Sequence, residues 1–244
     1  MLDHPFPITL PPTQDELPCD DGVPMETGRH RLQMELLINS LDQWLSRQDV
    51  FVGGNMFLYY SLAQVKNQDF KGPDVFVALD VAWRERKSWV VWEEGKPPDI
   101  VIELLSDSTR KVDKQEKKQI YQDRVRVAEY YWYDPFNSED FAGFILQGSE
   151  YTPLPFDSDN NLTSPRLDLK LVRWQGVYHR VDAVWLRWAT LAGELLPTDE
   201  ELAEQERQRA QQAQQQAEQA HQQAEQDHQQ AAEAQQVAEL GLHD

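Results

Sequence analysis

The sequence predicts an α/β domain built on one central mixed β-sheet with flanking helices, followed by a C-terminal helical tail. Three observations indicate this class: an amphipathic helical repeat near the start, a series of apolar strand-like segments interrupted by one polar helix, and a terminal stretch rich in Gln and Ala. Strands mixed with helices in this order are typical of a sheet covered by helices. A chain of 244 residues is long enough for one such domain with a sizeable core.

The individual elements follow from hydrophobic spacing. Residues 29–45 repeat apolar side chains at helical spacing, with Thr27 as the candidate N-cap, and residues 113–124 form the polar helix. Strands are expected at residues 50–52, 56–61, 74–79, 88–92, 100–105 and 129–133, and as short strands within 141–189. Turns are expected at Gln147-Gly148, Gln175-Gly176 and Ala192-Gly193. The six tryptophans at 83, 89, 92, 174, 185 and 188 are assigned to core and hairpin packing.

We divide the chain into an irregular Pro-rich lead at 1–24, a folded domain at 25–197 and a helical or coiled-coil tail at 199–240. Within the tail, Ala recurs every seven residues, at 203, 210, 217, 224, 231 and 238. This is the spacing of a coiled-coil seam, but alanine buries little apolar area and drives association weakly. Two interpretations stay open: a solvated or partly disordered single helix, and a coiled coil that joins two copies as a homodimer.

The composition indicates a cytoplasmic protein. The lead lacks the basic start and apolar stretch of a signal peptide, no apolar run is long enough to span a bilayer, and the single cysteine excludes an internal disulfide. We therefore expect no membrane partner. The net charge of −19 argues against strong non-specific binding to nucleic acid, although residues 107–126 carry a local net charge of +3.

One set of polar residues points to chemistry. Asp74 follows Gly72-Pro73 at the start of a strand. Glu103 lies inside the apolar segment IVIELL, where burying an unpaired carboxylate would destabilise the fold by roughly several kcal/mol. Asp113, Lys117 and Tyr121 are spaced four apart and share one face of the next helix.

Two carboxylates and an ammonium group can form a Mg²⁺ site for phosphodiester hydrolysis, in which the lysine orients water or stabilises charge. The alternative is ordinary capping and ion pairing at strand ends. Asp99 shares a strand face with Glu103 but lies about 13 Å along the strand, too far to hold the same ion, so Asp74 is the better partner.

The same residues carry a family resemblance. Pro73-Asp74, Glu103-Leu-Leu-Ser106, the helix with Asp113, Lys117 and Tyr121, then Glu129-Tyr-Tyr-Trp132 and Asp134-Pro135 follow one another in the chain. In this order they resemble the Uma (Uma-two) family of PD-(D/E)xK restriction-endonuclease-like proteins, over roughly residues 20–197.

The resemblance implies a restriction-endonuclease-like fold and an endonuclease that hydrolyses DNA phosphodiester bonds with Mg²⁺ or Mn²⁺. It implies that Asp74 and Glu103 are metal ligands and that Lys117 is the basic catalytic residue. It also implies supporting roles for the residues around them: Asp113, Tyr121, His30 and Glu26.

One position departs from the superfamily pattern. The lysine of that pattern normally lies two residues after the acidic residue on the same strand, where this chain has Leu105. Either Lys117 replaces it from the helix, as in the family, or the site is inactive. The second interpretation predicts a non-catalytic nuclease-fold module that acts in protein interaction or oligomerisation through its tail.

Overall fold

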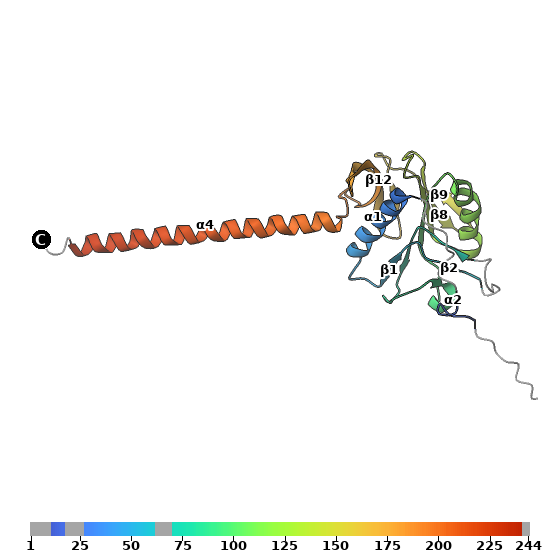
Figure 1. Cartoon of the computed structure of the whole chain (residues 1–244), viewed down its shortest axis with the longest axis horizontal. Coiled ribbons are helices and arrows are strands. Elements are labelled where there is room, and N and C mark those ends of the chain that lie inside the picture. Colours follow the sequence, from blue (N-terminus) through green and yellow to red (C-terminus); the bar gives the residue numbers. More distant parts are fainter. Residues whose placement is uncertain (1–10, 18–26, 62–69, 241–244) are drawn as a thin grey trace, which may run out of the picture. The chain divides into compact units, whose positions relative to one another are not determined.

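The computed structural model describes residues 11–17, 27–61 and 70–240, and only the backbone of residue 70 and of residues 227–240. The chain divides into two compact units, Met1–Leu196 and Pro197–Asp244. The first unit contains the sheets and the second contains the long C-terminal helix (Figure 1).

The first unit is built on a six-stranded mixed sheet with the strand order β1-β4-β6-β7-β8-β9. Its strands are β1 (Val50–Gly53), β4 (Val75–Leu79), β6 (Ile100–Leu104), β7 (Glu129–Tyr133), β8 (Phe141–Gln147) and β9 (Glu150–Pro153). β6 and β7 pair in parallel, whereas the other neighbouring pairs are antiparallel. The predicted fold class is therefore confirmed, and β4 and β6 are neighbours in this sheet.

Two three-stranded sheets accompany the central one. The first consists of β10 (Leu162–Ser164), β11 (Leu169–Tyr178) and β12 (Val181–Thr190), and the second of β3 (Phe70–Lys71), β2 (Leu58–Tyr59) and β5 (Trp89–Val90). The expected strand at 88–92 is half right, because the chain turns into the short helix α2 (Val91–Glu94) after β5.

The helices of the first unit lie near the predicted positions. α1 (Gly28–Trp44) begins at Thr27, whose Oγ1 accepts a hydrogen bond from the backbone N–H of His30, so the predicted N-cap is confirmed. The polar helix is a continuous helical stretch made of η1 (Val112–Lys117), α3 (Lys118–Ile120) and η2 (Tyr121–Val125). Its first and last segments are π-helical, a widened form that is frequent at functional sites.

The central sheet separates two apolar clusters. Along β6, Ile100, Ile102 and Leu104 belong to the cluster that contains Leu37 and Leu41 of α1, whereas Val101 belongs to the cluster that contains residues of η2. Both faces of β6 are thus covered, which explains the nearly continuous apolar sequence of this strand. The helical stretch at 112–125 consequently packs on the sheet face opposite α1 (Figure 1).

Two predictions for the later half are wrong. Gln175-Gly176 is not a turn but lies inside β11, and the strands β11 and β12 are ten residues each rather than short. The turn between them is at His179-Arg180, where both residues have positive φ. A β-carbon at Gly176 would lie 2.1 Å from the ring of Trp174, so the glycine makes room for that indole instead of turning the chain. The packing role predicted for Trp83 is also wrong, because this side chain is 72% exposed.

Residues 11–17 of the predicted N-terminal lead pack within the first unit. Trp92 Nε1 donates to the Pro12 carbonyl over 2.9 Å, and Leu17 is buried in a small cluster with Phe57 and Val90. Residues 11–17 are irregular in structure, as expected for the lead, yet Leu17 among them is buried.

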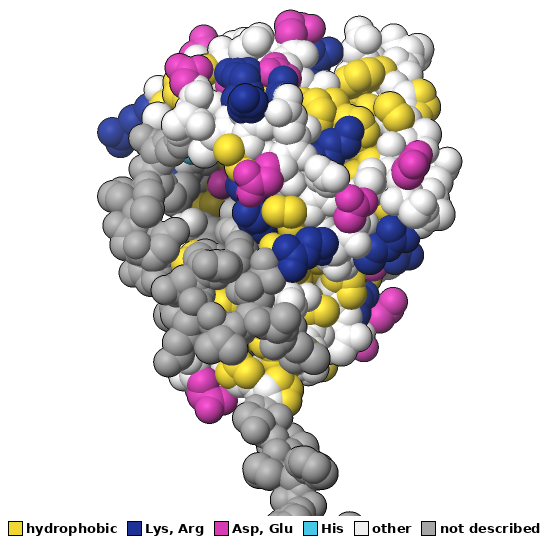
Figure 2. Space-filling model, turned by 90° about the vertical axis from the view of Figure 1, so that its right-hand side faces the viewer, with side chains coloured by type: hydrophobic (Ala, Val, Ile, Leu, Met, Phe, Trp, Pro, Cys, Tyr) yellow, Lys and Arg dark blue, Asp and Glu magenta, His cyan; other side chains and the backbone are white. Residues whose placement is uncertain are grey.

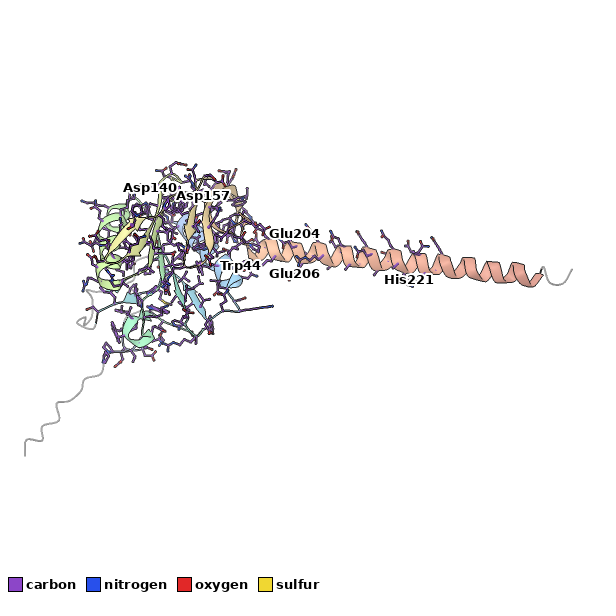
Figure 3. The ribbon with its side chains drawn as sticks, turned by 180° about the vertical axis from the view of Figure 1, so that it is seen from behind. Trp44, Asp140, Asp157, Glu204, Glu206 and His221 are labelled. Carbon is purple, nitrogen blue, oxygen red and sulfur yellow. The ribbon has the colours of Figure 1, made fainter. Side chains whose placement is uncertain are left out.

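The second unit is the helix α4 (Asp199–Leu240). It begins with a capping box: Thr198 N donates to Glu201 Oε2 over 2.8 Å, and Glu201 N donates to Thr198 Oγ1 over 3.2 Å. Side chains from 203 to 226 are exposed, including Glu204, Glu206 and His221 (Figure 3). Pairing of two tails stays a prediction. No helix in the described part of the chain combines the length and hydrophobicity needed to cross a membrane.

Candidate active site

The site is centred on a cross-strand pair of carboxylates. The antiparallel register of β4 and β6 pairs Val75 with Ile102, and one further step along the register places Asp74 opposite Glu103. Residues in such a pair project to the same face of the sheet. That face is the one covered by the 112–125 helix, since Phe76 and Val101 belong to the cluster on its side.

Glu103 has no exposed surface, and its two carboxylate oxygens have different partners. Lys117 Nζ lies 2.9 Å from Oε2, and the hydroxyl of Tyr121 donates to Oε1 over 2.9 Å. Both partners come from the helix that packs over the strand. The Lys117 ammonium therefore points towards the carboxylates.

Asp113 completes this helical face. Its Oδ1 lies 2.8 Å from Lys117 Nζ, and the residue is 1% exposed. In a regular α-helix, residues four apart drift around the axis because a turn takes 3.6 residues. The π-helical turn from Val112 to Lys117 takes more residues per turn and offsets that drift, so Asp113, Lys117 and Tyr121 stay close to one line.

Asp74 is placed by backbone contacts at the start of β4. Its Oδ2 accepts a hydrogen bond from the Leu104 amide over 2.7 Å, next to Glu103 on β6. Gly54 passes so close that a β-carbon there would lie 2.0 Å from the Asp74 carbonyl oxygen. The sequence shows the Gly53-Gly54 doublet, but only the fold reveals that the second glycine is needed to admit the Asp74 backbone.

The charges of the site do not balance. Asp74, Glu103 and Asp113 are three carboxylates around the single ammonium of Lys117. Burial, together with the charges of Asp74 and Asp113, raises the pKa of Glu103 to about 8 against the attraction of Lys117. Burial also raises the pKa of the partly exposed Asp74.

The cation responds in the opposite sense. Burial by itself would lower the pKa of Lys117, but the carboxylates of Glu103 and Asp113 outweigh burial and hold its pKa above the ordinary value. Lys117 therefore remains an ammonium ion at neutral pH, and the excess charge of the site is negative. A divalent cation would neutralise that excess.

The donor set suits a hard cation held in part by its substrate. Within the described residues, no group of three or more His, Cys, Asp or Glu side chains is arranged to hold a metal ion. Mg²⁺, however, is commonly bound through one or two carboxylates, with waters and substrate phosphates completing its coordination. Asp74 and Glu103 fit this mode.

The other residues considered in the sequence analysis lie outside the carboxylate cluster or outside the described residues. His30 is buried, its Nε2 lies 2.9 Å from the Leu105 carbonyl oxygen, and its Nδ1 lies 2.8 Å from Thr27 Oγ1, so it braces the end of β6. Leu105 itself is fully buried. Glu26 lies outside the described residues. Asp99 is ion-paired to Lys96 and Arg166, as expected for a residue too distant to share an ion with Glu103.

The helix that carries Lys117 also carries other basic side chains. Lys118 Nζ lies 3.5 Å from the centre of the Phe144 ring, and Lys114 forms an ion pair with Asp140. The face of the molecule seen in Figure 2 carries several Lys and Arg side chains interspersed with acidic and hydrophobic ones. The basic residues therefore do not merge into a single cationic patch on this face.

The family model described as "Uma2: Putative restriction endonuclease" matches residues 16–175. A search of curated proteins finds no match. One similar solved structure is described as a putative nuclease belonging to DUF820 from Anabaena variabilis ATCC 29413. It is 17% identical, with a TM-score of 0.42, over 64% of this chain and 90% of that one.

Proposed function

Because the chain belongs to the Uma2 family of putative restriction endonucleases, we propose that it is a Mg²⁺- or Mn²⁺-dependent DNA endonuclease with its active site at Asp74, Glu103 and Lys117. The single observation that carries the proposal is the environment of Glu103. A completely buried carboxylate faces Asp74 across the strand pair and lies 2.9 Å from the Lys117 ammonium. A structural core has no need of three carboxylates and one cation in so small a space.

Asp74 and Glu103 would hold the divalent ion. When bound, the ion polarises the scissile phosphate and lowers the pKa of a water molecule, which supplies the nucleophile for hydrolysis. The Leu104 amide holds the Asp74 carboxylate at the start of β4 by a hydrogen bond. The Tyr121 hydroxyl, from the helix, orients Glu103 in the same way.

Lys117 is the residue suited to meet the charge that develops on the phosphate. Its charge is maintained by Glu103 and Asp113, and its side chain is held between them. A fixed ammonium in a desolvated site stabilises developing negative charge without reorganisation. Asp113 and Tyr121 act through other groups and are positioning residues.

A non-catalytic module is the second candidate, favoured by Leu105. This leucine occupies the position of the strand lysine in the superfamily pattern, and its buried side chain leaves no charge there. In that case the exposed helix α4 would serve self-association or docking.

The test is plasmid cleavage by the full-length protein with Mg²⁺ or Mn²⁺, comparing wild type with Glu103→Ala. Endonuclease function predicts nicking or linearisation that requires both the metal and Glu103. A wild-type protein that binds neither ion and cleaves nothing over a range of pH would leave the module as the better account.

A further inference from the structure

A cavity of about 480 Å³ opens beside the candidate active site. Its lining comes from the start of α1, from the turn that follows β6, and from the turn that follows β7. β6 and β7 are the parallel pair of the central sheet, and both end at this edge. The crevice outside the carboxyl ends of parallel strands is where α/β sheets commonly bind ligands, and the volume is typical of small-molecule sites.

An aromatic ring forms one wall of the cavity. Phe136 is 59% exposed, which is unusual for a large apolar side chain, yet its backbone is held firmly. Its amide donates to Asp134 Oδ1 over 2.8 Å, and Asp134 is in turn ion-paired to Arg110. The Arg29 guanidinium lies 4.9 Å from the ring centre. A rigid exposed ring flanked by an arginine is the kind of platform on which unpaired nucleic-acid bases stack.

The polar groups of the lining suit an uncharged ligand. Arg110 is compensated by Asp134 and lies 3.7 Å from Asp107, so this arginine is not left as an uncompensated cation that would attract a phosphate. Thr27, Ser106 and Ser108 bring neutral hydroxyl groups to the lining. Thr27 Oγ1 is hydrogen-bonded to His30, and Ser106 Oγ is hydrogen-bonded to Ser108 and Thr109, so these groups add polarity to the wall without adding charge. An aromatic wall with hydroxyl groups around it is chemically matched to a nucleobase.

The cavity is also within reach of the reacting phosphate. Leu105, part of the lining, follows Glu103 by two residues, about 7 Å along a strand. Its carbonyl oxygen is bound by His30, whose ring lies 5.8 Å from that of Phe136. A nucleotide whose phosphate lies at Asp74 and Glu103 can therefore place a neighbouring base in the cavity.

We propose that the cavity binds one unpaired base of the DNA substrate by stacking on Phe136, so that the enzyme acts on DNA with unpaired nucleotides in preference to continuous duplex. The proposal rests on the proposed function, since it assumes that the substrate phosphate lies at the carboxylate pair. A paired base would first have to leave its stack and its partner, which is unfavourable. DNA that is already single-stranded or frayed avoids that step.

The experiment measures binding of a short single-stranded oligonucleotide to the full-length protein, with Ca²⁺ present so that no turnover is needed. Phe136→Ala is compared with Phe136→Trp, and Phe156→Ala is the matched control because Phe156 is an exposed phenylalanine outside the cavity lining. Loss of one stacked base predicts roughly 5- to 150-fold weaker binding for Phe136→Ala. Phe136→Trp and Phe156→Ala should bind like wild type.

An abasic oligonucleotide of the same length provides the second arm. Phe136→Ala should bind it as tightly as wild type does, because there is no base to stack. Two results would overturn the base pocket. One is that Phe136→Ala binds the normal oligonucleotide as tightly as Phe156→Ala does. The other is that Phe136→Ala loses as much affinity for the abasic oligonucleotide as for the normal one. Binding does not depend on cleavage, so the role of Phe136 can be measured even in a protein that fails to cut plasmid, and a protein that cuts plasmid can still fail this test.

Discussion

Replacing Glu103 by Gln is expected to stabilise the metal-free protein while abolishing cleavage. The substitution keeps the side-chain volume and removes a buried carboxylate from a site that has two others. The Gln amide oxygen can accept from Lys117, its NH2 group can donate to the Tyr121 hydroxyl oxygen, and Lys117 keeps its ion pair with Asp113. Most substitutions of buried, hydrogen-bonded residues destabilise a protein. The opposite sign here would be the mark of a site whose charges serve binding rather than folding.

The magnitude follows from the pKa of Glu103, which burial raises from 4.5 to about 8. Between these values the folded protein holds a proton that the unfolded chain has lost, so wild-type stability falls as pH rises through the window. At pH 7, about 2.5 pH units above the ordinary value, the loss is of the order of 3 kcal/mol. Gln has no such proton, so the advantage of Glu103→Gln should grow from pH 5 to pH 8.

The assay is urea unfolding of both proteins in EDTA at pH 5, 6, 7 and 8. Glu129 provides a matched control, since it is equally buried but accepts hydrogen bonds from Ser164, Tyr131 and the Arg166 amide. Glu129→Gln replaces three hydrogen bonds to a charged acceptor by weaker neutral ones, and two of the donors, the Ser164 and Tyr131 hydroxyls, would have to reorient to accept from the NH2 group. The variant should therefore be destabilised by about 1–3 kcal/mol. If Glu103→Gln also destabilises, or its effect is flat with pH, Glu103 is an ordinary ion-pair partner and the charge argument is wrong.

Three further outcomes are expected. Lys117→Ala should abolish plasmid cleavage, while calorimetry should still detect metal binding. Lys118→Ala should cleave at nearly the wild-type rate, because the Lys118 ammonium lies over Phe144 and not at the carboxylates; equal losses in the two variants would mean that the helix only binds phosphate. Mg²⁺ affinity should rise between pH 6 and 8, because the ion must displace the proton of Glu103, and titrations in buffers of different ionisation enthalpy should report proton release; pH-independent binding would contradict this. Deleting residues 199–244 should leave a cooperative melt, since the core clusters lie upstream; a lost transition would place α4 in the core.

The sequence by itself predicted the strands that carry the site. The apolar run around Glu103 can only be a covered strand, and a carboxylate within it needs a compensating partner whatever the fold. The spacing of Asp113, Lys117 and Tyr121 likewise requires one helical face. These inferences succeeded because strand and helix periods, and the free energy of burying a charge, are properties of a short segment.

Local sequence patterns failed where the placement of a side chain in the folded structure decided the outcome. Gly176 suggested a turn, but the residue is a glycine because the Trp174 ring occupies the space of a side chain. The true turn at His179-Arg180 uses two residues with positive φ that carry no strong turn signal. Trp83 looked like a core residue, and its exposure depends on what the rest of the chain leaves uncovered.

The amino-acid sequence alone determined which chemical groups the site contains, and the tertiary structure decided which of them meet. Pairing of β4 with β6 brings Asp74 opposite Glu103, and packing of the helix brings Lys117 to within 2.9 Å of the same carboxylate. The cavity beside Phe136 exists because the parallel strands β6 and β7 end at the same edge of the sheet, where α1 begins. Register and packing depend on contacts between residues far apart in the chain, and no local pattern encodes those distances.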